Sequence, residues 1–400
     1  MSREGFHKEL AINQMVAAYP NELFVRAFES ICQGTEITVK GEKTFELQPM
    51  ISVLEQPQKR VLTIPYRRLN PFFLLAESLW LLAGKSDAGF ITYFNPRLNE
   101  YLDEGEFVRR DGSIGNNFHG AYGQRLMESP GRRSKYINQL EQCYKRLKAD
   151  LNSRQAVMTI WNPSRDNTEI ETKDTPCNIA ISFKVRDGKL NMSVFNRSND
   201  FVWGYCSTNI VQFSVIQEVL AGYLGVEIGR YIQYSDSMHV YESNPYYKAY
   251  HQPNSKVKAA AHYHHVWNKY DIYKSVKPLP IKSESPEEFE ADVQKTYDII
   301  DRLITGKDVE IYSVKNEYLK LTKEALSTWM LIQDGYFLEA TENIRDMVLC
   351  DWKVEIIRYM YTHLMRQGWE QGNIVDELGI EQLPIVAATY VMHDDGEALI

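Results

Sequence analysis

The chain has 400 residues and a formal net charge of −8, from 45 lysines and arginines against 53 aspartates and glutamates. Apolar residues make up 44% of it and charged residues 24%, which excludes a disordered, collagen-like or coiled-coil rod as its main character. The acidic balance argues against a surface for non-specific nucleic-acid binding, although a local basic pocket for a small anion remains open.

The five cysteines are few and odd in number, and no CxxC pair occurs, so we expect neither a disulfide framework nor a structural zinc site. The most apolar run, residues 71–83, contains Glu77 and is too short to span a bilayer, and the first residues lack the pattern of a secretory signal. The P-loop, Rossmann and HExxH patterns are absent. We therefore expect a cytoplasmic protein with no metal and no membrane or nucleic-acid partner.

The predicted elements begin with a hairpin over residues 34–39 and 44–47, turned by Lys40-Gly41. Asn70, Pro71 and Gly84 then bracket an apolar segment as N-cap, first helical residue and stop, which predicts a buried helix. The middle of the chain predicts strands over residues 156–161, 178–185 and 190–195, the last two joined by an Asp-Gly turn. A helix over residues 209–224 and extended chain over 227–241 follow.

The pattern changes near residue 284. Ser285-Pro286 opens a helix that runs towards Gly306, and two more helical stretches follow, at about 315–333 and 336–366. We place a domain boundary here, between an α/β body over residues 1–284 and a mainly helical extension over 285–400. The apolar stripes of the extension predict core packing, with a partner interface as the alternative.

Two residues carry the first chemical signals. Glu77 interrupts an apolar helix, so either the helix turns this position to solvent or the carboxylate is buried and tuned for proton handling. Cys177 is either a packed small hydrophobe or a nucleophile, and a nucleophile needs a nearby cation. The Asp187-Gly188 hairpin pairs residue 178 with residue 197, which sets Arg197 beside the thiol and favours the nucleophile.

Three polar residues remain open at this point. Asn209 begins a predicted helix, where a plain N-cap is its simplest role. His239 and Tyr241 alternate along a strand and so face the same side, either as a surface pair or as part of a site.

In order and spacing these residues resemble the thymidylate synthase family. The resemblance covers roughly residues 30–282 and is carried by residues 74–84 around Glu77, 120–123, 153–154, 161–163, 175–177, 196–200, 204 with 209, 239–241 and 277–280. It implies an α/β (α+β) fold with a large twisted mixed sheet and flanking helices, here with a C-terminal helical extension. It also implies a homodimer in which two sheets stack back to back.

The resemblance implies a pyrimidine nucleoside monophosphate as substrate and 5,10-methylenetetrahydrofolate as one-carbon donor. Cys177 would attack C6 of the pyrimidine, so that C5 can attack the folate methylene. Glu77 and Tyr122 would move protons on and off the base. Binding roles would fall on Arg197, Ser198 and the partner subunit's Arg154 for the phosphate, on His239 and Tyr241 for the sugar 3′-hydroxyl, on Asn209 for the base, and on Asp200, Glu77, Leu98 and Tyr101 for the folate.

Asn209 also bears on the base. A carboxamide can donate to uracil O4 and accept from N3–H, whereas an ionised carboxylate can only accept, which suits the cytosine amino group. An asparagine here favours deoxyuridylate (dUMP).

The chain departs from the family in its phosphate site and near the base. The loop over residues 29–34 lacks the family's arginine, and Gln155 stands in place of a second one. The candidates to replace them are Arg60, Arg67 and Arg68. In addition, Asn178 replaces the family's histidine after the nucleophile, and one residue is inserted between positions 204 and 209.

The departures near the folate leave the reaction open. Residues 98–101 replace the family's Trp-x-x-Trp, and the helical extension displaces its short C-terminal tail. Both features help to exclude water while hydride moves from the folate. With water excluded, the products are thymidylate (dTMP) and dihydrofolate, which we favour because this is the commoner activity of the family. Entry of water would give hydroxymethyl-dUMP and tetrahydrofolate, and a non-catalytic nucleotide-binding relative is the third alternative.

Overall fold

The computed structural model describes residues 13–64, 66–103, 107–108, 114–130, 136–168, 171–258, 270–309 and 313–393. A six-stranded mixed sheet forms the centre, in the order β1 (Asn13–Ala17), β4 (Met50–Leu54), β13 (Glu227–Ser235), β11 (Lys189–Asn196), β10 (Asn178–Arg186) and β9 (Val157–Thr159). β1 runs parallel to β4 and β11 to β13, and the other neighbours are antiparallel. Helix α7 (Asn209–Leu224) packs across β11 and β13, which confirms the expected α/β class.

A second, smaller sheet brings distant parts of the chain together. Its order is β12 (Asn199–Asp200), β14 (Met238–Tyr241), β3 (Glu42–Leu47) and β2 (Thr35–Val39). The β2–β3 turn uses Lys40 and Gly41 at φ of 51° and 83°, and the β10–β11 turn uses Asp187 and Gly188 at 51° and 72°. Positive φ at both central residues is the geometry of a tight hairpin turn, so both predicted hairpins are confirmed.

The register of the β10–β11 hairpin differs by one residue from the prediction. Asn178 pairs with Asn196 rather than with Arg197, because the ladder shifts between Asn178 and Ala180. An extra residue in one strand displaces all pairing beyond it. The backbone N–H of Arg197 therefore donates to the carbonyl of Cys177, at 3.0 Å.

Helix α2 (Pro71–Leu82) lies at the core and ends where its sequence signals predict. The Asn70 side chain accepts from the backbone N–H of Phe73 at 3.1 Å, and Gly84 follows the helix at a φ of 72°. All of its residues except Glu77 are buried. Such an apolar helix needs cover on every side.

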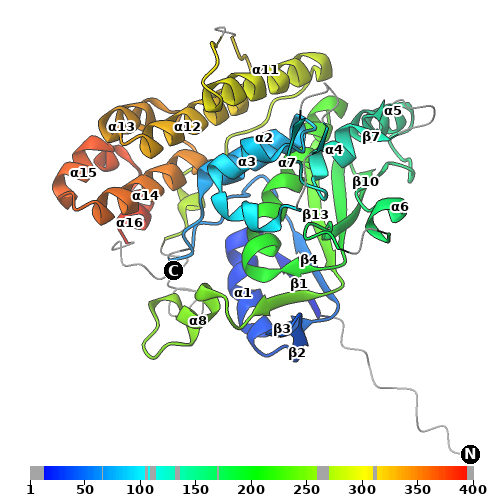
Figure 1. The fold of residues 1–400 in the computed structure, drawn as a ribbon, viewed down its shortest axis with the longest axis horizontal. Helices are drawn as coiled ribbons and strands as arrows, with labels where there is room; N and C mark the ends of the chain where they lie inside the picture. Colours follow the sequence, from blue (N-terminus) through cyan, green and yellow to red (C-terminus); the bar gives the residue numbers. More distant parts are fainter. Residues whose placement is uncertain are drawn as a thin grey trace, which may run out of the picture.

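The C-terminal helices supply much of that cover. They are α11 (Pro286–Ile304), α12 (Glu317–Gln333), α13 (Phe337–Asp346), α14 (Asp351–Arg366), α15 (Gln371–Glu377) and α16 (Ile385–Met392). Figure 1 shows them gathered on one side of the molecule, with the large sheet on the other. The Trp329 ring lies 5.2 Å from that of Phe72, and Arg358 Nη2 donates to the carbonyl of Leu69 at 2.9 Å. The predicted helical stretch over 336–366 is two helices, because the chain becomes extended at Met347.

The remaining elements connect these layers. They are α1 (Pro20–Cys32), α3 (Ala88–Phe94), η1 (Pro96–Tyr101), β5 (Phe107–Val108), β6 (Ile114–Gly115), α4 (Tyr122–Met127), β7 (Ser129–Pro130), β8 (Tyr136–Ile137), α5 (Gln139–Ala149), α6 (Pro163–Asp166), η3 (Phe201–Thr208), α8 (Pro245–His251), η4 (Ile272–Lys274) and η5 (Ile380–Gln382). No helix within the described ranges has the length and apolarity to cross a bilayer.

Candidate active site

Cys177 lies at the end of an extended segment, immediately before β10. Burial raises the pKa of its thiol; the nearby Arg197 guanidinium and a hydrogen bond with Ser198 act in the opposite direction, while Asp174 and Asp200 raise it further. The structure thus brings together the predicted nucleophile and its predicted cation. The net rise keeps the thiol protonated in the protein alone, so a proton must leave it before it can attack.

Arg197 is bound to the segment that carries the thiol. Its Nε donates to the carbonyl of Pro176 at 2.9 Å and its Nη2 to that of Thr175 at 3.1 Å. Its guanidinium also lies over the Trp161 ring, 5.6 Å from the centroid. Arg197 therefore fixes the backbone next to Cys177, and its phosphate-binding role stays a prediction.

Glu77 projects from α2 towards α7; the residue as a whole is partly exposed, but its carboxyl oxygen Oε2 is buried. Burial raises the pKa of its carboxyl to about 7, and a hydrogen bond with Gln212 partly offsets the rise. Its Oε2 is buried and has no hydrogen-bond partner among the described residues. A buried carboxyl that titrates near neutrality is suited to accepting and releasing a proton.

Tyr122 begins α4 and interacts with both Cys177 and Glu77. Its hydroxyl contacts the backbone of Cys177, and its ring stacks on Phe213 of α7 with centroids 6.0 Å apart. Burial, together with Cys177, Asp174 and Glu77, raises the pKa of the phenol well above its usual value. The hydroxyl therefore stays protonated and can donate a hydrogen bond.

The segment between Asp200 and Asn209 is a π-helix, η3, which runs directly into α7. Asp200 caps it, since its Oδ1 accepts from the backbone N–H groups of Val202 and Trp203 at 2.7 Å each. A π-helix takes up extra residues within a helix and is frequent at functional sites. The one-residue insertion inferred from the sequence, between positions 204 and 209, falls in this part of the chain. Asn209 is therefore not an N-cap but a residue inside a continuous helix.

The predicted sugar-binding pair lies on β14. Asp200 on β12 pairs with His239, and the rings of His239 and Tyr241 lie 5.2 Å apart, as expected for side chains on one face of a strand. Burial raises the pKa of Tyr241, and Asp200, Cys177 and Tyr101 add to that rise. Tyr241 therefore lies close enough to Cys177 to interact with it electrostatically, and His239 lies beside Tyr241.

The predicted folate side is formed by η1. Burial raises the pKa of Tyr101, with contributions from Asp200, Glu100 and Cys177, so the phenol faces the same site. Its side chain is nevertheless 53% exposed, whereas Leu98 packs against the core. Tyr101 is thus a largely exposed aromatic residue within electrostatic range of Asp200 and Cys177.

Arg154 does not belong to the cluster around its own Cys177. It is exposed. The pKa of Lys184 is lowered mainly by burial, and the positive charge of Arg154 contributes to the lowering. Lys184 is seven residues along β10 from Cys177, or about 23 Å at the rise of a strand. This position leaves the expected role of Arg154 in a partner subunit's site as a prediction.

The candidate replacement arginines are differently placed. Arg60 is buried in an ion pair with Glu218 in the core, so it is not available for a phosphate. Arg67 Nη2 donates to the carbonyl of Val202 in η3, and its guanidinium lies 5.7 Å from the centre of the Tyr246 ring. Burial lowers the pKa of Arg67. Arg68 has a positive φ of 30°.

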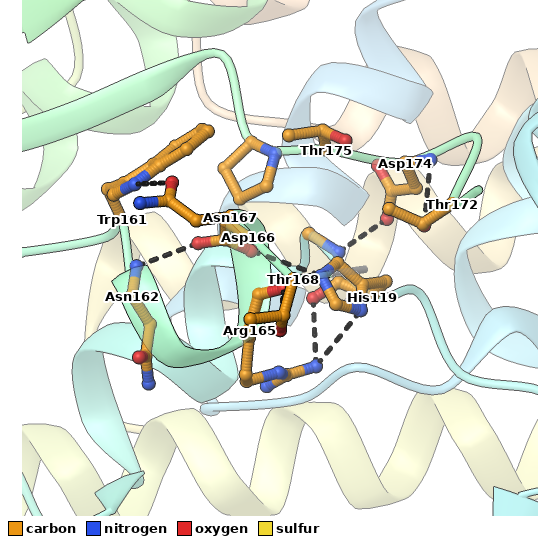
Figure 2. A network of polar contacts seen from close by, with 12 residues as sticks. His119, Trp161, Asn162, Arg165, Asp166, Asn167, Thr168, Thr172, Asp174 and Thr175 are labelled. Atoms are coloured by element: carbon orange, nitrogen blue, oxygen red, sulfur yellow. Dashed lines mark hydrogen bonds and ion pairs between the residues drawn. The ribbon is translucent and has the colours of Figure 1, made fainter. Parts of the chain in front are cut away.

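A buried polar cluster anchors the loop that leads to Tyr122, as Figure 2 shows around His119 and Asp166. Arg125 donates to both carboxylate oxygens of Asp166, at 2.7 and 2.8 Å, and to the carbonyl of His119 at 2.8 Å. His119 Nε2 lies 3.0 Å from Asp166 Oδ1. These contacts fix His119, three residues before the first residue of α4, against Arg125 and Asp166.

Asp174, which the sequence did not single out, joins this loop to the nucleophile segment. The backbone N–H of Gly120 donates to Asp174 Oδ2 at 2.7 Å, and a Cβ at Gly120 would lie 2.5 Å from the Asp174 carbonyl oxygen. On the other side, Asp103 accepts from Thr172 Oγ1 at 2.6 Å and from the Lys173 backbone at 2.7 Å. The segment before Cys177 is thus tied both to Asp103, just after η1, and to the loop that leads to Tyr122.

Gln212, which hydrogen-bonds with Glu77, was also not singled out from the sequence. Its position three residues after Asn209 places it on the same face of α7 and could have indicated it. Within the described ranges, no group of three or more histidine, cysteine or acidic side chains is arranged to hold a metal ion.

Comparison with known proteins gives the class. The family model described as thymidylate synthase matches residues 41–269. The deoxyuridylate hydroxymethyltransferase of Bacillus phage SP01 is 31% identical over 361 residues, covering 86% of this chain and 92% of that protein. The protein of the same name from Pseudomonas phage M6 is 34% identical over 236 residues, or 59% of this chain and 62% of its own. The chain belongs to the thymidylate synthase family.

Proposed function

We propose that the protein is a deoxyuridylate hydroxymethyltransferase. It would convert dUMP, 5,10-methylenetetrahydrofolate and water into 5-hydroxymethyl-dUMP and tetrahydrofolate. The methylene carbon moves from the folate to C5, the C5 proton is lost, and water supplies the new hydroxyl group. No electrons are transferred overall, so the folate leaves without being oxidised to dihydrofolate.

The extent of the match to the Bacillus phage SP01 protein carries this proposal. It covers 86% of the 400 residues, about 344, which exceeds the 284 residues that precede the helical extension. The match therefore runs through at least some 60 residues of the extension, where the family model, which ends at residue 269, does not reach. The helical extension, which lies outside the family model, is thus at least partly shared with a protein named for hydroxymethyl transfer.

The site supports the proposed chemistry. Cys177 would form the bond to C6, after giving up its thiol proton. Glu77, with a pKa of about 7, and the protonated Tyr122 would handle the protons of the base. The folate would lie against Tyr101 and Asp200, whose aromatic surface and spare carboxylate oxygen fit a flat heterocycle with N–H groups. The 53% exposure of Tyr101 leaves this side open to water.

A homodimer fits the uncovered face of the large sheet. The register places Val16, Tyr234, Phe195 and Val157 on one face, opposite α7. Phe195 on the interior strand β11 is 42% exposed, and Val16 and Val157 on the two edge strands are 53% and 47% exposed, so this face of the sheet presents apolar side chains to solvent. Stacking two such faces would bury them and would bring the partner subunit's Arg154, which lies near this face, towards the phosphate.

Incubation with dUMP and methylenetetrahydrofolate in H₂¹⁸O tests the reaction, followed by product mass and the absorbance of dihydrofolate. The proposal predicts a hydroxymethyl product carrying ¹⁸O and no dihydrofolate. A methyl product with one equivalent of dihydrofolate would instead establish thymidylate synthesis. Tight nucleotide binding with no product at all would establish the binding-only alternative. Cys177→Ala is the control for uncatalysed reaction.

A further inference from the structure

Beneath Asn209 lies a chain of buried carboxamides that ends on the backbone. Gln233 Nε2 donates to the carbonyl of Tyr205 at 3.1 Å, and Asn199 Nδ2 donates to Gln233 Oε1 at 3.3 Å. Asn209 Nδ2 then donates to Asn199 Oδ1 at 3.2 Å. All these residues are buried, with Gln233 at 0% and Asn199 at 1% exposure.

The direction of this chain is set at its backbone end. A carbonyl oxygen can only accept, so Gln233 must present its amide nitrogen to Tyr205 and its oxygen to Asn199. Asn199 must then present its nitrogen to Gln233, and Ser235 Oγ accepts from the same nitrogen at 2.9 Å. The oxygen of Asn199 is left facing Asn209. A flipped Asn209 would set two carboxamide oxygens against each other in a buried site, which is costly.

Gly204 shows how closely the last link is packed. A Cβ at this position would lie 2.8 Å from Asn209 Nδ2 and 2.9 Å from Asn199 Oδ1, the two atoms that form the hydrogen bond. Gly204 lies in the π-helix η3. The local backbone and the carboxamide chain therefore form one arrangement.

We propose that Asn199 and Gln233 are positioning residues that lock the orientation of Asn209, and thereby make the site select uracil over cytosine. The preference for uracil expected from Asn209 in the sequence needs this lock, because a 180° flip of a free asparagine exchanges its donor and acceptor. One orientation matches O4 and N3–H of uracil, and the other matches the amino group and N3 of cytosine. The inference rests on the proposed uracil nucleotide substrate, and it assigns the choice of base to residues that do not touch the base.

The test compares Asn199→Leu with wild type through the ratio of kcat/KM for dUMP to that for dCMP. Loss of the acceptor beside Asn209 should lower this ratio roughly tenfold, the effect of one hydrogen bond on a binding equilibrium. Gln233→Leu, which keeps Asn199 in place but frees it to flip, should lower the ratio by less. Asn21→Ala is the matched control, since Asn21 is a buried, hydrogen-bonded asparagine paired with Thr63 and is absent from the site; its ratio should match wild type.

Calorimetric binding of dUMP and dCMP to the same variants in a Cys177→Ala background gives the ratio without turnover. If wild type proves inactive on dUMP, the proposed function fails while this binding ratio still tests the carboxamide chain. Equal weakening of both nucleotides, or an unchanged ratio in a folded Asn199→Leu protein, would overturn the inference. If Asn199→Leu does not fold, Gln233→Leu carries the same test.

Discussion

The carbonyl of Cys177 accepts the backbone N–H of Arg197 at 3.0 Å, while the Arg197 side chain bonds the carbonyls of the two preceding residues. Arg197 therefore binds the backbone at Cys177 and at the two residues before it, and its positive charge lies near the Cys177 sulfur. This follows from the shift in the β10–β11 ladder, which moves Arg197 from opposite Asn178 to opposite Cys177.

Asp174 is expected to position this segment against the tyrosine loop. Asp174→Ala removes the acceptor of the Gly120 N–H and should lower the rate of C5 tritium release from labelled dUMP by about 10–100-fold, because small misplacement of reacting groups is costly. Asp174→Asn keeps an acceptor and should retain most of the rate.

The charge of Asp174 gives a second readout. Burial raises the pKa of Asp174 to about 6, so at pH 7.5 it is ionised and adds to the raised pKa of Cys177. Asp174→Asn should therefore speed alkylation of Cys177 by iodoacetamide at that pH, followed by peptide mass. Asp150→Ala, which removes an exposed aspartate that accepts from the Asn152 backbone, is the matched control. Equal rates of tritium release by Asp174→Ala and wild type would argue against the positioning role of Asp174.

Glu77 should make stability depend on pH. Its pKa is about 7 in the folded protein against an ordinary value of 4.5, so the folded state holds this proton more tightly. The resulting stabilisation is complete below pH 4.5 and is lost as the pH rises through 7, with an upper limit of about 3 kcal/mol. Glu77→Gln should thus gain stability over wild type between pH 5 and pH 8 while losing activity.

Thermal unfolding at the two pH values measures this gain. Glu339→Gln, a substitution at an exposed carboxylate of α13, is the control: its difference in stability from wild type should be the same at pH 5 and pH 8. If the difference in stability between Glu77→Gln and wild type is the same at both pH values, the pKa of Glu77 is not raised in the folded protein.

The sequence predicted those elements whose signals are local. Asn70, Pro71 and Gly84 set both ends of α2, and the Lys-Gly and Asp-Gly turns set two hairpins. It did not predict the ladder shift after Asn178, the π-helix or the break at Met347, because each depends on partners elsewhere in the fold. Asp174 and Gln233 were missed for the same reason, since their bonds to Gly120 and Tyr205 span 54 and 28 residues.

The helical extension should be part of the folding unit that contains Glu77. Trp329 is buried against Phe72 of α2 and Tyr359 of α14, so Trp329→Ala should destabilise the protein by about 3–5 kcal/mol. Chemical denaturation measures the change, with Tyr336→Ala at a 55% exposed position as control. A loss below about 1 kcal/mol would support an independent extension and strengthen the boundary predicted near residue 284.

Arg154 gives a test of the proposed dimer. If it acts in the partner's site, Arg154→Ala and Cys177→Ala are each impaired alone. A refolded equal mixture should recover about a quarter of wild-type activity, since half the dimers are hybrids with one complete site of two. No recovery in a mixture shown to contain hybrids would place Arg154 outside the partner's site.

The central claim is covalent attack by Cys177 on the pyrimidine, and release of tritium from [5-³H]dUMP tests it most directly because both methylation and hydroxymethylation require it. We predict release by wild type that depends on methylenetetrahydrofolate, and none by Cys177→Ala, with both proteins folded to the same extent. Release by Cys177→Ala at the wild-type rate would contradict the claim, as would its absence from folded wild type saturated with both substrates.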